Sequence, residues 1–192
     1  MEPITRDDIV DIAEYERIRP AFRKHVVEMK KNRRLPVGDR MTLVFENRDT
    51  VRFQIQEMMR VERMVDENAI RHEIETYNQL IPGKRELSAT MLIEIQEYGR
   101  IKEYLDALVG LTRDCVFLEV NGDRVAAAFD EDQSEDGRIS AVQYIRFRMT
   151  DKMVEDFRDA EKPARIVVEH PNYSHTADIN GDVRRSLIGD LA

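Results

Sequence analysis

The sequence predicts an α+β fold, in which a helix-rich N-terminal part packs on a mostly antiparallel β-sheet formed largely by the C-terminal part. Most segments with helical apolar spacing lie before residue 110, and most alternating segments typical of strands lie after it. This segregation favours α+β packing over a parallel β-α-β sheet. A chain of 192 residues suits one compact unit, with a helix-rich lobe over residues 1–110 and a β-rich lobe over residues 111–192.

The N-terminal helices are predicted from capping residues and apolar periodicity. Thr5 followed by Asp8 is a helix-capping pattern, so a first helix is expected over residues 6–18. Pro20 fits the first turn of a second helix, because proline lacks the N–H that this position leaves unpaired. Residues 35–40 contain a proline and a glycine and are expected to form a turn.

The middle of the chain is predicted to contain a helical hairpin between two strands. A short strand over residues 41–45 is followed by a long helix that runs to about Val65. Asp66 is a capping residue for the next helix, and the two helices with their short joint are expected to form an antiparallel αα-hairpin. A strand over residues 87–95 and a helix around residues 101–108 follow.

The C-terminal part is predicted from alternation and turn residues. Two alternating runs, residues 116–120 and 125–129, flank Asn121-Gly122, and Asn-Gly in that setting is a strong signal for a β-hairpin. Residues 130–138 are expected to form an acidic loop. The remaining predicted elements are strands over residues 139–147, 165–168 and 176–179 and helices after Thr150 and Asn180.

Composition restricts the classes of function. The 38 acidic residues outnumber the 30 basic ones, and the net charge of −8 argues against non-specific binding to nucleic acid. No apolar run approaches the ~20 residues that span a bilayer, and the acidic N-terminus is unlike a signal peptide. The single cysteine, Cys115, excludes an internal disulfide. We therefore expect a cytoplasmic protein with no membrane partner. The common phosphate-loop, nucleophile-elbow and metal-binding motifs are absent from the sequence.

The first candidate site is the strand-to-helix corner at Glu46 and Asn47. A helix N-terminus offers unpaired N–H groups and a favourable dipole for an anion, and Arg48 and Arg52 add positive charge. A phosphate or carboxylate could bind there. The alternative is structural: Asn47 caps the helix, and the arginines pair with Glu46 and Asp49.

Glu62 is a second candidate, because it interrupts an apolar stripe. Val51, Ile55, Met58 and Val65 share one face of the predicted helix, and Glu62 falls among them. A buried carboxylate must be paired, protonated or bound to a ligand. We therefore predict that Glu62 is buried against an arginine, either as a structural ion pair or as a functional acid. The alternative is that the helix is only partly covered by the rest of the protein. The candidate arginines are Arg17, Arg19 and Arg146.

The third candidate site contains His170 and His175. If residues 171–174 form a four-residue hairpin loop, these imidazoles face each other with Cβ atoms ~5 Å apart. They could then share a divalent transition metal, with Glu169, Asp178 or a partner chain completing the coordination. The alternative is two surface histidines in a turn whose residues serve the backbone.

Several segments resemble those of a known protein family. They are Phe45-Glu46-Asn47-Arg48-Asp49-Thr50-Val51, Tyr77-Asn78-Gln79-Leu80-Ile81-Pro82-Gly83 and Ala141-Val142-Gln143-Tyr144-Ile145-Arg146-Phe147. Nearly end to end, the chain is similar to a bacterial family of unknown function, DUF3501, for which no activity, catalytic residue or cofactor is established. The resemblance implies genes beside those of rubrerythrin and a heterodisulfide-reductase-like iron–sulfur protein, and hence a role near peroxide defence or a related redox pathway.

Three functions are therefore considered. The first is an accessory or interaction protein with a redox-protein partner, which a deep pocket rich in titratable groups would count against. The second is a small-molecule or anion-binding protein, or an enzyme, which a concave pocket at the strand-to-helix corner would favour. The third is a metalloprotein. The residues assigned to the ligand-binding function are Glu46, Asn47, Arg48, Arg52 and Glu62. Those assigned to the metalloprotein are His170 and His175. A homo-oligomer is compatible with each.

Overall fold

The structure is a computed structural model that describes residues 1–130 and 139–191. Its helices are α1 (Ile12–Lys31), α2 (Arg48–Val61), α3 (Glu67–Asn78), α4 (Ile101–Ala107), α5 (Asp151–Arg158) and α6 (Gly181–Asp190). Its strands are β1 (Arg34–Val37), β2 (Met41–Phe45), β3 (Glu86–Ile93), β4 (Val116–Val120), β5 (Asp123–Ala126), β6 (Ala128–Phe129), β7 (Val142–Arg148), β8 (Ala164–His170) and β9 (Tyr173–Asp178). Short 3₁₀ turns cover Arg6–Asp8 and Tyr98–Arg100.

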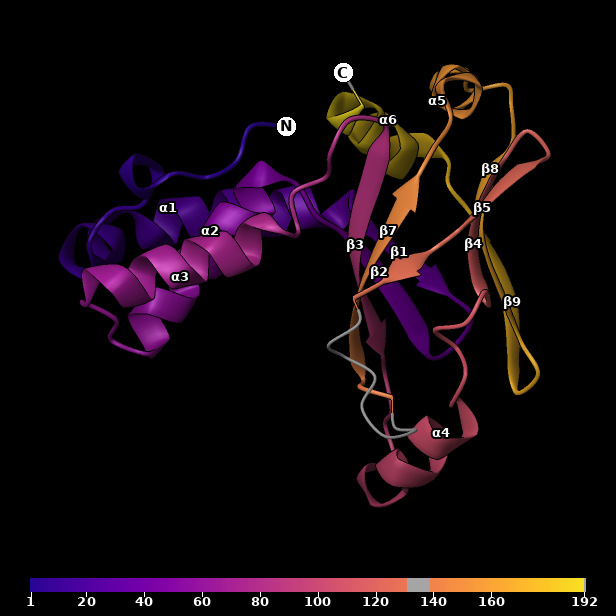
Figure 1. Cartoon of the computed structure of the whole chain (residues 1–192), viewed down its shortest axis with the longest axis horizontal. Helices are drawn as coiled ribbons and strands as arrows, with labels where there is room; N and C mark the ends of the chain where they lie inside the picture. The colour runs from indigo at the N-terminus through magenta and orange to yellow at the C-terminus, as the bar shows by residue number, and fades with distance from the viewer. Residues whose placement is uncertain (131–138, 192) are drawn as a thin grey trace.

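Two antiparallel sheets and a helical layer confirm the predicted α+β class. The first sheet has the strand order β1-β2-β3-β7-β6 and the second β5-β4-β8-β9. Helices α1, α2 and α3 lie together on one side of the first sheet, and the second sheet lies on its other side (Figure 1). The acidic loop expected over residues 130–138 lies, apart from Asp130, outside the described residues. Within the part that is described, no helix is long and apolar enough to cross a lipid bilayer.

The main apolar core lies between the two sheets, and strand alternation explains it. In β2, β3 and β7 every second side chain points into this core, because successive side chains of a strand point to opposite faces. The apolar ones among those side chains are Met41, Leu43, Phe45, Leu87, Ala89, Met91, Ile93, Ile145 and Phe147. The residues between them occupy the face of the first sheet that the helices only partly cover, and this face carries most of the polar groups described below.

Helix α1 differs from the prediction at Pro20. It is one helix of 20 residues with Pro20 inside it, capped by Asp11, whereas Thr5 caps only the preceding 3₁₀ turn. A proline removes one helical hydrogen bond and crowds the preceding turn, which normally ends or bends a helix. Here α1 buries Tyr15 before the proline and Val26 after it, so packing on both sides stabilises the continuous helix.

Helices α2 and α3 form the expected αα-hairpin around a second, smaller core. Val51, Ile55, Ile70 and Ile74 contribute to this core, together with other apolar residues of the N-terminal segment and of α3. Asp66 caps α3 as predicted, since its side chain accepts a hydrogen bond from the third residue of the helix. The hairpin thus places α2 above the end of β2, from which it directly follows in the chain.

The Asn121-Gly122 hairpin is confirmed, except that residues 128–129 of its predicted second arm pair with the first sheet. Both turn residues have positive φ, 49° and 89°, as a two-residue hairpin turn with matching twist requires. Strands β4 and β5 pair through this turn. The chain then leaves the second sheet: the Ala127 N–H donates to Val116 O, and the next residue, Ala128, pairs with Arg146 of the first sheet. One extended run therefore belongs to both sheets.

The segment over residues 35–40 was expected to be a turn, but its first half is strand. Strand β1 pairs with β2 from Arg34↔Val44 to Val37↔Met41, and only the following residues turn. Pro36 is exposed on this edge strand, where the missing N–H costs no ladder hydrogen bond. The first sheet thus combines β1, β2 and β3 with β6 and β7, and the segments 1–110 and 111–192 both contribute to it.

Candidate ligand-binding pocket

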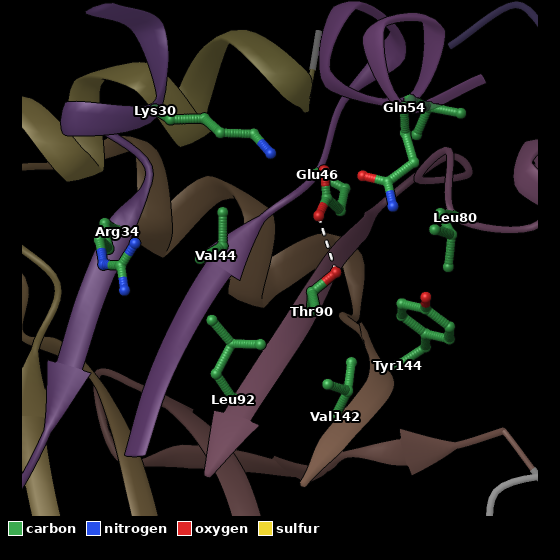
Figure 2. A pocket seen from close by; sticks show the side chains of 11 residues that line it. Lys30, Arg34, Val44, Glu46, Gln54, Leu80, Thr90, Leu92, Val142 and Tyr144 are labelled. Atoms are coloured by element: carbon green, nitrogen blue, oxygen red, sulfur yellow. Dashed lines mark hydrogen bonds between the residues drawn. The ribbon is translucent and has the colours of Figure 1, made fainter. Parts of the chain in front are cut away.

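A pocket of about 310 Å³ lies where the helices meet the partly covered face of the first sheet (Figure 2). It is open to solvent on one side. Its polar lining residues are Lys30, Arg34, Glu46, Gln54, Thr90 and Tyr144, and its apolar ones are Val44, Val51, Leu80, Leu92 and Val142. A few polar groups set among apolar side chains are typical of sites for small organic molecules.

The strand register forms the floor of the pocket. Arg34 pairs with Val44, Val44 with Thr90, and Thr90 with Tyr144. Residues that are directly opposite on neighbouring strands share a face of the sheet, so these four side chains form one row across β1, β2, β3 and β7. Residues separated by more than a hundred positions in the chain are thus brought side by side.

The roof comes from the helices. Lys30 lies near the end of α1, Gln54 lies in α2, and Leu80 follows α3. Figure 2 shows the Lys30 and Gln54 side chains reaching over the strands toward Glu46. The pocket therefore depends on how the helical layer sits on the sheet.

Glu46 is the buried acid of this pocket, with a side chain that is only 6% exposed. Its Oε1 accepts a hydrogen bond of 2.7 Å from the Thr90 hydroxyl, and its Oε2 accepts one from the Thr50 hydroxyl. Among the described residues, no lysine, arginine or histidine nitrogen lies within 4.0 Å of the carboxylate. A carboxylate can accept about four hydrogen bonds, so its remaining acceptor capacity is open to another donor.

Arg33 fixes the backbone directly behind Glu46. Its guanidinium, 1% exposed, donates to Phe45 O at 2.8 Å and to Glu46 O at 2.9 Å. It also forms a buried ion pair with Asp190 of α6. Burial raises the pKa of the Asp190 carboxyl, and the bond from Arg33 opposes part of that rise. The strand end that carries Glu46 is thereby tied to the last helix.

Asn47 caps α2, as the structural alternative predicted. Its side chain accepts from the Thr50 N–H at 3.0 Å, and its own N–H donates to the Thr50 hydroxyl at 2.9 Å. This reciprocal arrangement is a capping box. Thr50 therefore has two roles, because the same hydroxyl that closes the cap also donates to Glu46.

Arg48 and Arg52 contact the N-terminal segment instead of an anion site. Arg48 forms an ion pair of 2.7 Å with Asp8, and Arg52 Nε donates to Asp8 O at 2.8 Å. The partners expected from sequence, Glu46 and Asp49, are not the ones used. The Thr5 N–H and, next, Arg48 hold the pKa of Asp8 at about 2. Arg48 is thus already paired with an acid of the chain, and Arg52 is already bound to a backbone carbonyl.

The prediction for Glu62 is wrong. Helix α2 ends at Val61, and Glu62 is the exposed residue that follows it. Arg63 adopts a left-handed conformation, φ 51°, and the Met64 N–H donates to Met59 O, which together close the helix. The predicted stripe continued to Val65, which lies beyond this end and is 82% exposed. The helix ends without a glycine, so the sequence contained no strong signal for its end.

The glutamate of α2 that does contact an arginine is Glu57, which the sequence analysis missed. Arg19, one of the predicted partners, donates to both its oxygens at 2.6 and 2.9 Å. The Tyr15 hydroxyl donates to Glu57 at 2.7 Å. The Arg19 bond lowers the pKa of Glu57, whereas burial and the Glu57 bond raise the pKa of Tyr15. This cluster joins α1 to α2 and lies outside the pocket.

The predicted facing pair of His170 and His175 is also wrong. The β8–β9 hairpin has a two-residue loop, so His170 pairs with Tyr173, and His175 pairs with Val168. Both ring nitrogens of His170 are engaged: Nδ1 accepts from the Asn172 N–H, and Nε2 lies 3.2 Å from Val109 O. In residues 1–130 and 139–191, no group of three or more histidine, cysteine, aspartate or glutamate side chains is placed to hold a metal ion. The geometry on which the metal prediction depended is absent.

A smaller pocket of about 160 Å³ adjoins the first. The two share Leu80 and Tyr144. The smaller pocket is also lined by Glu73, Thr76, Tyr77, Gln79 and Asp130. Burial raises the pKa of Glu73. The pKa of Tyr144 is raised as well, first by burial and then by the charges of Tyr77, Glu46 and Asp130.

The fold and pocket together define a two-sheet α+β protein with a ligand-sized pocket around one buried carboxylate. The chain belongs to the family described as protein of unknown function DUF3501, whose model matches residues 3–191. It is similar to the crystal structure of a protein of unknown function from Burkholderia pseudomallei K96243, with 35% identity, a TM-score of 0.92 and full coverage of both chains. The search of curated proteins finds no match. Because both descriptions state an unknown function, the redox role stays a prediction from resemblance.

Proposed function

We propose that this protein binds a small organic molecule in the pocket around Glu46. The observation that carries the proposal is a buried carboxylate that borders a pocket and has only hydroxyl partners among the described residues. The volume of about 310 Å³ lies at the lower end of the range for small-molecule sites. A compact ligand fits such a volume.

Comparison with Glu86 supports a ligand role for Glu46. Glu86 lies on the same face of the first sheet and is equally buried, at 6% exposure. It is compensated within the chain, by Arg148 at 3.5 Å and Arg146 at 3.9 Å. Buried charges are expensive unless paired. The chain therefore compensates one buried carboxylate on this face with arginines and leaves the other to hydroxyl groups beside an open pocket.

The lining residues have distinct roles in this proposal. Glu46 accepts a hydrogen bond from the ligand, while Thr50 and Thr90 fix the orientation of its carboxylate. Lys30 supplies positive charge from the roof, and the apolar side chains contact the ligand's carbon frame. The concave, titratable lining favours a binding protein over the accessory-protein hypothesis.

The test uses the full chain and one matched control. Native mass spectrometry of protein purified from cells, and ligand-observed NMR with a library of small polar molecules, should detect a bound compound. Glu46→Gln keeps the side-chain shape and should abolish this binding, as should Val142→Trp, which fills the pocket. Glu86→Gln removes an equally buried carboxylate outside the pocket and should leave binding intact. Failure to detect any bound molecule by either method would overturn the proposal, and so would equal binding by Glu46→Gln.

A further inference from the structure

The two sides of the pocket carry opposite charge. Lys30 and Arg34 lie on the side of β1, and Glu46 lies between them and Tyr144 (Figure 2). Beyond Tyr144 the adjoining smaller pocket is lined, among the described residues, by the acids Glu73 and Asp130 and by no basic side chain. The charge therefore changes from positive to negative along the line that leads from β1 to β7.

Lys30 is the cation available to a ligand on the positive side. Arg34 already forms an ion pair of 2.8 Å with Glu94. Within the described part of the chain, Lys30 has no ion pair and no side-chain hydrogen bond. Its ammonium group reaches over the strands from the end of α1 (Figure 2). An anionic group of the ligand would find a partner here without displacing an existing one.

The negative side favours a cationic group. Glu46 has open acceptor capacity, and the rise in the pKa of Tyr144 reflects burial together with the nearby negative charges of Glu46 and Asp130. An ammonium group can donate three hydrogen bonds and would compensate the buried carboxylate. Val44 and Leu92 of the floor line the same pocket and suit a short hydrocarbon frame.

Resting on the binding function proposed above, we infer that the ligand is a small zwitterion, with an ammonium group at Glu46, a carboxylate at Lys30 and a short apolar frame between them. A simple anion would meet the buried Glu46 carboxylate and be repelled by it. A simple cation would leave Lys30 without a partner. A molecule with both charges satisfies both ends, and the apolar middle disfavours a polar linker such as a sugar.

The first experiment compares zwitterions with matched single-charge analogues. The probes are leucine and the series of ω-amino acids from three to eight carbons, with hexylamine and hexanoate as controls. Isothermal titration of the full chain should show that one of these zwitterions, with one particular distance between its charges, binds most tightly. That probe should bind about ten-fold or more tightly than either single-charge control, since each lost ion pair removes a substantial share of affinity. Equal binding by hexanoate or by hexylamine would overturn the inference.

Two variants test whether Glu46 binds the ammonium group of the ligand and Lys30 binds its carboxylate. Glu46→Gln should weaken the best zwitterion and hexylamine but not hexanoate. Lys30→Met should weaken the same zwitterion and hexanoate but not hexylamine, and because Lys30 is partly exposed it keeps the test valid if Glu46→Gln folds poorly. Glu86→Gln is the control for both. If native mass spectrometry finds a Glu46-dependent ligand that lacks one of the two charges, the zwitterion inference fails while the binding function stands.

Discussion

Buried charged side chains in this protein fall into two groups. Arg33, Glu86 and Asp156 each have an oppositely charged partner within the chain. Glu46 is held only by two hydroxyl groups. The difference matters because the interior penalises an uncompensated charge far more than the surface does. An external cation at Glu46 would therefore compensate a buried carboxylate that has only hydroxyl partners among the described residues.

Asp8 gives the folded state a defined sensitivity to acid. The Thr5 N–H and, next, Arg48 lower the pKa of Asp8 from 3.8 to about 2. Since the folded pKa lies below the unfolded one, the charged form stabilises the fold above the unfolded value, and this contribution is lost as the pH falls from 3.8 toward 2. We expect Asp8→Asn to lower the free energy of unfolding at neutral pH and to flatten its pH dependence over this interval.

Urea denaturation at a series of pH values measures this effect. Asp7→Asn, at the exposed neighbouring position, is the control and should leave the pH dependence as in the parent protein. An Asp8→Asn variant with the parent's slope between these pH values would show that Asp8 does not contribute.

Single residues were predictable from sequence where their role is local. Asn47 and Asp66 are caps that depend only on the next three residues, and Glu46 belonged to the predicted strand-to-helix corner. Thr90 and Tyr144 could not be assigned to the same site, because only the pairing register brings them beside Glu46. The pocket is therefore a property of the sheet and cannot be read from any one segment.

At the scale of elements, Arg184 of α6 completes the end of α5. Its guanidinium donates to four backbone carbonyls, those of Asp156, Phe157, Asp159 and Lys162. The last carbonyls of a helix have no partner within it, so an external donor stabilises the end. We expect Arg184→Met to lower the free energy of unfolding by about 3 kcal/mol, because several buried acceptors lose a charged donor.

Chemical denaturation measures the change, and the adjacent Arg185 provides the control. Arg185 is exposed and, among the residues that the structure describes, pairs only with Asp182, so Arg185→Met should change stability by less than ~0.5 kcal/mol. Equal effects of the two substitutions would mean that the carbonyl contacts of Arg184 contribute no stability.

Gly38 sets the distance between the β1–β2 turn and β9. It has φ +72°, and a Cβ there would lie 2.5 Å from the Tyr173 hydroxyl and 2.6 Å from His175 Cγ. That hydroxyl donates to Val37 O and accepts from the Arg40 N–H, so the contact cannot easily give way. We expect Gly38→Ala to lower the free energy of unfolding by more than the ~1–2 kcal/mol that a left-handed backbone alone costs.

Gly122→Ala separates the cost of the left-handed backbone from the cost of the steric contact. Thermal unfolding compares the stability of the two variants. Gly122 also has positive φ, +89°, but no heavy atom of the described residues other than the glycine and its two chain neighbours lies within 4 Å of the position of its Cβ. The larger loss should therefore occur at Gly38. The same loss at both positions would indicate that backbone conformation alone explains the effect.

Elements defined by local chemistry were the predictable ones. The Asn121-Gly122 hairpin and the helix after Thr150 formed as expected, because turn and cap residues act over a few positions. Strand β1 was missed, since Pro36 and Gly38 suggested a turn, whereas the exposed edge of the sheet tolerates the proline. The end of α2 was misplaced because Arg63 adopts a backbone conformation more usual for glycine.

At the scale of the whole molecule, the Arg33–Asp190 ion pair joins positions 157 residues apart. Removing one partner leaves the other charge buried, at a cost of ~3–5 kcal/mol. We expect Asp190→Ala to show that loss in the free energy of unfolding. Hydrogen exchange should also accelerate in β2, since Arg33 holds the carbonyls at its end.

Two further variants test whether the loss belongs to the ion pair. Asp182→Ala, on the exposed side of the same helix, should have little effect. The double variant Arg33→Met with Asp190→Leu should recover much of the lost stability, because apolar side chains can replace a buried pair. A double variant as unstable as Asp190→Ala would contradict this explanation.

The run from β5 into β6 has a consequence for how a ligand enters. The Ala127 N–H bonds to one sheet, and the next residue pairs with the other. One residue spans at most ~3.6 Å, so the sheets cannot shear past each other at this point without breaking a ladder. The floor of the pocket is thereby held rigid against the second sheet. Because the pocket is already open to solvent on one side, any widening of it around a ligand is expected from the roof, through displacement of α1 and α2 relative to the strands beneath them.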